Sequence, residues 1–172
     1  MRLSSGKTLI FSIIFLSVIP NLYVQAQSFT PRLGFGLSIV GGTTDQAVGI
    51  GIDTRLAWIV NQDLSISTSA NFINYIFKGR DEAAYFFHPQ ISAIVTLNAA
   101  NVQSPYLIMG LGGNIPLGGT AESHDSGPSL HAGTGWVFSL QATSLYLEIT
   151  PALIIVRSSV EVQLPLRFGV IL

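Results

Sequence analysis

The chain has 172 residues, of which 48% are hydrophobic and only 10% are charged, and its formal net charge is −1. Soluble domains carry about 25% charged residues, so this composition is poorly suited to building a water-facing surface. The near-neutral balance also lacks the basic footprint of a nucleic-acid-binding protein, so no nucleic-acid partner is expected. Because cysteine is absent, disulfides, thiolate chemistry and lipid attachment through a cysteine are excluded.

The first 26 residues have the pattern of a cleavable signal peptide. Arg2 and Lys7 are positively charged, residues 9–19 form an apolar core, and Val24-Gln25-Ala26 supplies a cleavage site. The alternative is an uncleaved anchor, but the apolar core is shorter than the ~20 residues that span a bilayer. We therefore expect export, with residues 1–26 as the signal peptide and residues 27–172 as one domain.

Residues 27–172 contain six Lys and Arg against nine Asp and Glu, a net charge of −3, and no apolar run long enough for a membrane helix. A closed β-barrel is the other structure that satisfies every backbone group in lipid. We therefore predict an all-β fold, an eight-stranded antiparallel up-and-down transmembrane β-barrel. Its expected strands are residues 31–40, 47–60, 64–77, 85–98, 105–113, 128–140, 144–156 and 160–172.

Each expected strand alternates apolar residues with small or polar ones. Turn residues separate the strands, as in Asn61-Gln62-Asp63, and the longest loop is expected at residues 114–127. Pro89 removes one donor from the strand ladder, so a local irregularity is expected there. An even number of strands lets the first and last strands pair antiparallel and close the barrel.

The polar face consists mostly of Gly, Ser, Thr and Asn with few charges, which suits the narrow interior of an eight-stranded barrel. We therefore expect the apolar face to contact lipid. A secreted, lipocalin-like ligand-binding barrel is the alternative, and it would need a well-charged exterior. Aromatic residues at strand ends are expected to contribute to interfacial girdles: Trp58, Tyr85, Phe87, Trp136 and Phe138.

Counting residues across the expected hairpins places the inward charges. The first hairpin sets Arg32 opposite Arg55 and Gly34 opposite Asp53, and the last hairpin brings Glu148 to Arg167 or within one step of it. We predict a buried ionic cluster in the lumen, with Asn71 and Gln90 completing the ring: Arg32, Asp53, Arg55, Glu148 and Arg167. Such charges must be paired or hydrated. The cluster either plugs the barrel or lines a narrow gated ion path, which planar-bilayer conductance would distinguish.

The sequence contains few candidate catalytic or metal-binding residues. Ser129, His131 and Glu148 superficially suggest a Ser-His-acid set, but the expected register places Glu148 opposite Trp136 and Val137, away from His131. His88 and His131 are better explained as hydrogen-bonded packing residues. The spacing of Glu122, His124 and Asp125 in the long loop is too generic for a metal site. We predict no enzyme activity, no cofactor and no metal.

The ending of the chain carries a resemblance to a known family. Leu164, Leu166, Phe168, Val170 and Leu172 resemble the C-terminal signal read by the barrel-insertion machinery, which usually ends in an aromatic residue, whereas this chain ends in Leu. Together with residues 2–26, Pro105-Tyr106, Gly110 and Gly112, this ending resembles the small outer-membrane β-barrel proteins of Gram-negative bacteria. These are the OmpX and OmpA-barrel type, often described as the porin family or the outer membrane protein beta-barrel domain.

The resemblance implies an integral outer-membrane protein whose partners are outer-membrane lipid and, during biogenesis, the barrel-insertion machinery. Its role would be structural, surface-interaction or minor permeability, around a lumen filled with side chains. An external ligand or surface partner is not identified by the sequence. A lipid-modifying enzyme of the outer membrane is a further alternative, and it would require a catalytic set that these residues do not supply.

Overall fold

The computed structural model describes residues 30–42, 48–76, 83–98, 102–119, 124–157 and 159–172. The predicted signal peptide and residues 78–82, which lie between the expected strands 64–77 and 85–98, are outside the described residues. The strands are β1 (Arg32–Gly42), β2 (Val48–Ile59), β3 (Leu64–Ile76), β4 (Ala84–Thr96), β5 (Gln103–Leu117), β6 (Gly127–Ser139), β7 (Ser144–Ile149), β8 (Ala152–Ile155) and β9 (Val160–Ile171). Within this part of the chain, no helix has the length and apolar character needed to cross a membrane.

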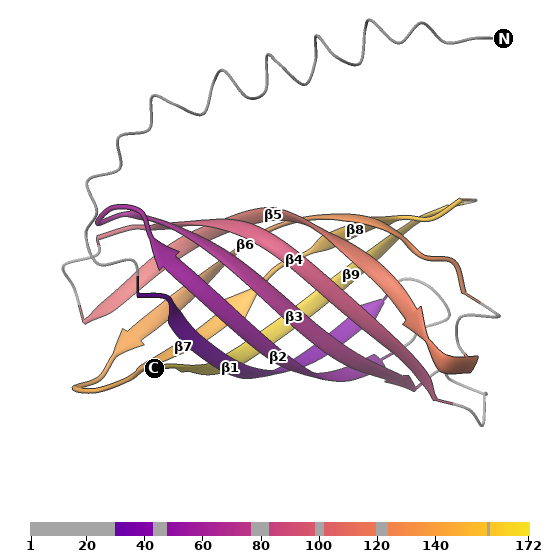
Figure 1. Cartoon of the computed structure of the whole chain (residues 1–172), viewed down its shortest axis with the longest axis horizontal. Coiled ribbons are helices and arrows are strands. Elements are labelled where there is room, and N and C mark those ends of the chain that lie inside the picture. Colours follow the sequence, from indigo (N-terminus) through magenta and orange to yellow (C-terminus); the bar gives the residue numbers. More distant parts are fainter. Residues whose placement is uncertain (1–29, 43–47, 77–82, 99–101, 120–123, 158) are drawn as a thin grey trace, which may run out of the picture.

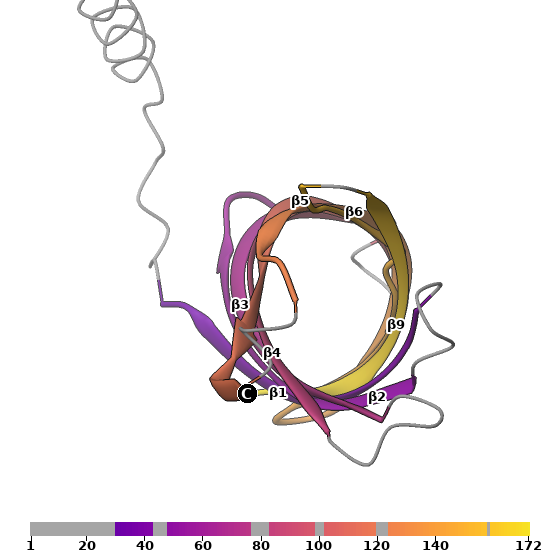
Figure 2. The same cartoon turned by 90° about the vertical axis from the view of Figure 1, so that its right-hand side faces the viewer.

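The strands form one closed ring in which each strand is antiparallel to its neighbours (Figures 1 and 2). β1 pairs with β9, for example at Gly36 and Gly169, so the two edges of the sheet meet. β7 and β8 both pair with β6 and with β9 and share one position in the ring, which makes an eight-stranded barrel. The predicted fold class and the closing pair are confirmed.

The break between β7 and β8 was not predicted from the sequence. It falls at Thr150 and Pro151, where proline has no N–H to donate to the ladder. The Thr150 N–H donates to the carbonyl oxygen of Pro165, and the Ala132 N–H donates to that of Pro151, both at 3.2 Å. The chain therefore continues along the barrel wall, and the register on β9 is the same on both sides of the break.

The pairing of β4 with β5 shows the irregularity expected at Pro89. Phe87 pairs with Ile115 and Gln90 pairs with Gly112, and the ladder is interrupted at His88 and Pro89 between them. β5 itself is longer than predicted. It continues to Leu117, so its end occupies the first residues of the expected loop at 114–127.

Most large apolar side chains point outward from the barrel, and most of the side chains that point inward are small or polar. In β2, the side chains of Ile50 and Ile52 are 61% and 60% exposed, whereas Asp53, the next residue along the strand, is fully buried. The same alternation runs along β9 and the other strands. The predicted orientation of the two faces is confirmed, and it is the reverse of what a water-soluble lipocalin-like barrel needs.

The register of two hairpins differs from the prediction. In the first hairpin Gly34 pairs with Arg55 and Gly36 with Asp53, two residues away from the expected pairing. Between β6 and the β7–β8 segment, Glu148 lies opposite Gly135 rather than Trp136 or Val137. In the first hairpin, a slip of two residues keeps every side chain on its predicted face, so alternation alone could not detect it.

The barrel has two ends, a terminal end and a loop end. The terminal end is the one where β1 begins at Arg32 and β9 ends at Ile171, next to the C-terminus marked in Figure 1. The loop end is the opposite one, where β4 begins at Ala84 and β9 begins at Val160.

Candidate functional site

Glu148 of β7 is the centre of a hydrogen-bonded cluster in the middle of the lumen. Its carboxylate accepts two hydrogen bonds of 2.9 Å from the guanidinium of Arg55 on β2. It accepts a third, of 3.2 Å, from Arg167 on β9, and a fourth, of 2.9 Å, from the hydroxyl of Tyr106 on β5. Both ion pairs are buried. The Glu148 carboxylate therefore connects β7 with β2, β5 and β9.

The second anion, Asp53, is joined to the same cluster through an aromatic ring. The hydroxyl of Tyr146 donates to Asp53 at 3.2 Å, and the Arg55 guanidinium lies 5.0 Å from the centroid of the Tyr146 ring. Arg167 also donates to the side-chain oxygen of Gln90, at 2.9 Å. The buried cluster therefore contains two cations and two anions, which balances its charge without solvent ions.

Arg32 is not part of this cluster, and its inclusion among the buried charges is corrected. Its side chain is exposed at the terminal end, where Arg32 pairs with Ala57 and not with Arg55. The structure brings the other four charges together: Asp53, Arg55, Glu148 and Arg167. Of the two amides expected to complete the ring, Gln90 bonds to Arg167, and Asn71 forms a separate pair with Ser38.

Glycines on the inner face allow these contacts to form across an intervening strand. Tyr106 and Glu148 both lie beside Gly135, so the tyrosine hydroxyl reaches the carboxylate through the space that a side chain would fill. The Tyr146 ring likewise covers Gly169 and Gly36 to reach Asp53. The glycines of the inner face therefore leave space in which larger side chains from neighbouring strands pack.

A serine–histidine pair, which the sequence analysis missed, lies in the same lumen. The Ser92 hydroxyl is 2.8 Å from Nε2 of His131, and both residues lie beside Gly110, which leaves room between them. Nδ1 of His131 has no hydrogen-bond partner in the described part of the chain, so no acid orients this pair. The set of Ser129, His131 and Glu148 is not assembled either, because Glu148 binds Arg55, Arg167 and Tyr106.

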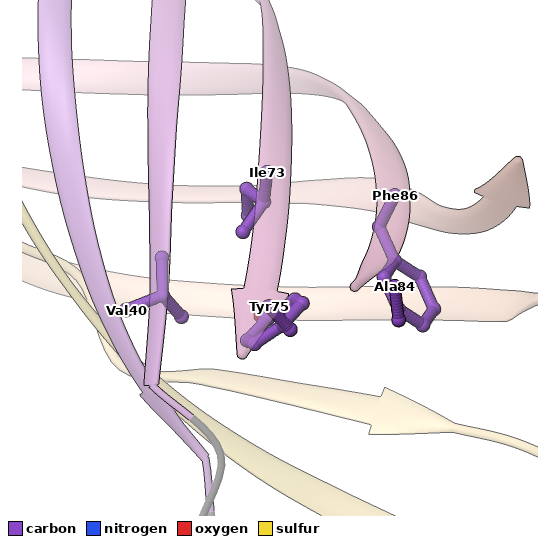
Figure 3. Close-up of a cluster of buried hydrophobic side chains, with 5 residues drawn as sticks. All are labelled: Val40, Ile73, Tyr75, Ala84 and Phe86. Carbon is purple, nitrogen blue, oxygen red and sulfur yellow. The ribbon is translucent and has the colours of Figure 1, made fainter. Parts of the chain in front are cut away.

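Towards the loop end the lumen is filled by apolar side chains, which the sequence analysis did not predict. β1, β3 and β4 contribute the cluster drawn in Figure 3: Val40, Ile73, Tyr75, Ala84 and Phe86. The rings of Tyr75 and Phe86 meet edge-on at 5.4 Å, and His124 contacts Phe86 in the same way at 5.4 Å. The lumen therefore contains two kinds of filling, an ionic layer and an apolar layer.

Across the described residues, no group of three or more His, Asp or Glu side chains could hold a metal ion. Of the three loop residues considered in the sequence analysis, Glu122 lies outside the described residues.

The residues of the expected insertion signal lie on β9 and just after it. Leu164, Leu166, Phe168 and Val170 point outward, and the N–H of Leu172 donates to the carbonyl oxygen of Leu33 at 2.8 Å. The same strand carries Arg167 inward to the ionic cluster. β9 therefore joins the apolar exterior, the closing seam and the luminal site.

No protein-family model matches the chain, and no curated protein matches it. Solved structures do resemble it. Neisserial surface protein A matches with a TM-score of 0.68 and 18% identity, over 83% of this chain and 96% of that one. Ail, the attachment invasion locus protein of Yersinia pestis, matches with a TM-score of 0.52 and 12% identity, over 83% of this chain and 97% of that one.

The N-terminal β-barrel domain of OprF from Pseudomonas aeruginosa matches with a TM-score of 0.50 and 13% identity, over 83% of this chain and 100% of that one. These neighbours are eight-stranded outer-membrane barrels. The chain has the fold of a transmembrane β-barrel. At such low identities the likeness concerns the fold of this transmembrane barrel and not its luminal residues.

Replacing Glu148 by glutamine tests the ionic cluster. The Glu148→Gln variant removes the carboxylate that pairs with both Arg55 and Arg167 and leaves Asp53 as the one buried anion of the cluster, so we expect a loss of about 3–5 kcal/mol in the free energy of unfolding. Glu161→Gln is the matched control: this half-buried residue lies near the loop end and should change stability by less than about 1 kcal/mol. Guanidinium unfolding in lipid vesicles, followed by tryptophan fluorescence, measures both. Equal losses in the two variants would contradict the central role of Glu148.

Replacing Gly36 by alanine tests the seating of Tyr146. The added methyl group would lie 2.8 Å from the backbone oxygen of Phe168 and would overlap the Tyr146 hydroxyl, so we expect a loss of about 1–3 kcal/mol. Gly41→Ala adds the same methyl group on the same strand where no heavy atom lies within 4 Å. The same unfolding measurement should show almost no change for Gly41→Ala, and a similar response of the two variants would refute the interlock.

Proposed function

We propose that the protein is a non-enzymatic integral outer-membrane barrel of the OmpX and OmpA-barrel type, with a structural or surface-interaction role. The observation that carries the proposal is the closed ring whose large apolar residues face outward while its charges are paired inside. Such an exterior can be solvated by lipid hydrocarbon and not by water. The strands of the wall, apart from the divided β7–β8 segment, have 11 to 15 residues, which is long enough to cross the hydrocarbon layer.

Two features favour a structural or surface role over permeability. The ionic cluster around Glu148 joins strands on opposite sides of the lumen, and the apolar cluster around Phe86 fills it nearer the loop end. An ion crossing the barrel would have to displace both. Two of the neighbours are named as a surface protein and an attachment invasion locus protein, which agrees with a role at the cell surface.

An enzyme role receives less support. The Ser92–His131 pair faces the lumen, and His131 has no acid partner among the described residues. A serine nucleophile requires a base that is itself held in the right tautomer. A lipid-modifying activity would therefore need groups that this arrangement does not bring together.

In this proposal residues 1–26 direct export and are removed, the barrel-insertion machinery recognises the β9 ending, and outer-membrane lipid surrounds the exterior. The terminal end then faces the periplasm, because the short turns at 61–63 and 141–143 lie there. The loop end faces outward, where a surface partner would bind.

Cell fractionation tests the proposal. The full chain, produced in a Gram-negative host, should be recovered in the outer-membrane fraction with Gln27 as its first residue, and it should migrate differently on gels before and after heating. A chain lacking residues 2–26 is the control and should remain in the cytoplasm. Recovery of the mature full chain in the soluble periplasmic fraction would overturn the proposal and favour a secreted barrel.

A further inference from the structure

The terminal end of the lumen contains a cavity of about 250 Å³. Arg55 and Tyr106 of the ionic cluster form its inner wall, and Arg32 with the hydroxyls of Ser139 and Ser144 lies at its outer rim. Neither the proposed structural role nor the ionic cluster uses this cavity. The cavity is formed by side chains of the barrel strands and of the adjoining turn at Gln62.

The charge on the cavity wall has one sign. The lining residues include Arg32 and Arg55 and no Asp or Glu. The charge of Arg55 is balanced by Glu148, whose carboxylate accepts hydrogen bonds from both terminal nitrogens of the guanidinium. Arg32 forms no ion pair with any residue that the structure describes. Among the described residues, the side chains that line the mouth therefore include one cation without an ion-pair partner.

Arg55 also retains a hydrogen-bond donor. Its Nε–H has no partner in the described part of the chain, although the residue is only 4% exposed. A buried donor without an acceptor is unfavourable. Because less than 1 Å² of this nitrogen is accessible, a ligand can accept its hydrogen bond only when the side chains around it move. Arg32 and Arg55 lie on the same face of neighbouring strands, diagonally across Gly34, so both can approach one anionic group.

The other residues that line the cavity indicate which chemical groups such an anion would have besides its charge. Ile94 and Val137 line the sides of the cavity, while serine and threonine hydroxyls surround its opening. A cavity of about 250 Å³ is large enough for a short organic molecule. A carboxylate accepts hydrogen bonds from guanidinium groups in a favourable planar geometry.

We propose that this mouth binds a small organic carboxylate, with the charged group between Arg32 and the Nε–H of Arg55 and the apolar part against Ile94 and Val137. The site is specific for a carboxylate with a short apolar body. An inorganic anion lacks the apolar part, and a neutral amide lacks the charge. Binding requires only the folded barrel, so it is independent of where the protein acts in the cell.

Nuclear magnetic resonance on the full chain in detergent micelles tests this site, with pentanoate as the probe and pentanamide as its neutral counterpart. Pentanoate should shift the backbone amide signals of Ser65, Thr96, Ser139 and Ser144 in a saturable way, and pentanamide should not. Arg32→Gln should weaken pentanoate binding roughly two- to fivefold, as expected for one exposed charge.

Arg157→Gln is the matched control, since it removes one exposed positive charge near the loop end, far from the cavity. It should leave pentanoate binding unchanged, and both variants should keep the wild-type amide spectrum elsewhere. Equal shifts from pentanoate and pentanamide, or equal weakening in the two arginine variants, would overturn the proposal. An equal response to inorganic phosphate would also overturn it, because the site would then recognise charge without the apolar body.

Discussion

The rest of the structure depends on one buried carboxylate. Glu148 receives two hydrogen bonds from Arg55, one from Arg167 and one from Tyr106, and these partners come from β2, β9 and β5. Inside a narrow ring surrounded by lipid, an unpaired charge has little water to solvate it. Every luminal charge must therefore be paired. The partners of Glu148 lie on strands that face one another only in the closed barrel, so the ionic cluster and barrel closure depend on each other.

The pairing works because the inner wall has gaps. Gly135, Gly36 and Gly169 carry no side chain, so Tyr106 and Tyr146 can pass over neighbouring strands and reach the two carboxylates. Gly36 and Gly169 leave the outer surface continuous, because their neighbours on each strand are large and apolar: Phe35, Leu37, Phe168 and Val170. One alternating pattern therefore supplies a lipid-facing exterior and an interlocked interior, and the apolar cluster near Phe86 completes the filling towards the loop end.

Alternation made the number of strands, their faces and the closing β1–β9 pair predictable, because a period of two identifies the face of each residue. It does not give the height of a residue along the barrel. Arg32 was expected to be buried because it lies on the inward face, but a two-residue difference in register places it at the rim. The Ser92–His131 pair was missed for a related reason: its residues are two strands apart and meet across Gly110.

In this arrangement, alternate residues of each strand contact hydrocarbon, while their neighbours are enclosed in the lumen. The chain has no cysteine, so single cysteines can be placed at successive positions of β2 from Val48 to Ile59 and labelled with a fluorophore in vesicles. Quenching by nitroxide-bearing lipid should be strong at Ile50 and Ile52 and weak at Gly49 and Gly51. Strong quenching at the glycines with weak quenching at the isoleucines, or no alternation along the strand, would contradict it.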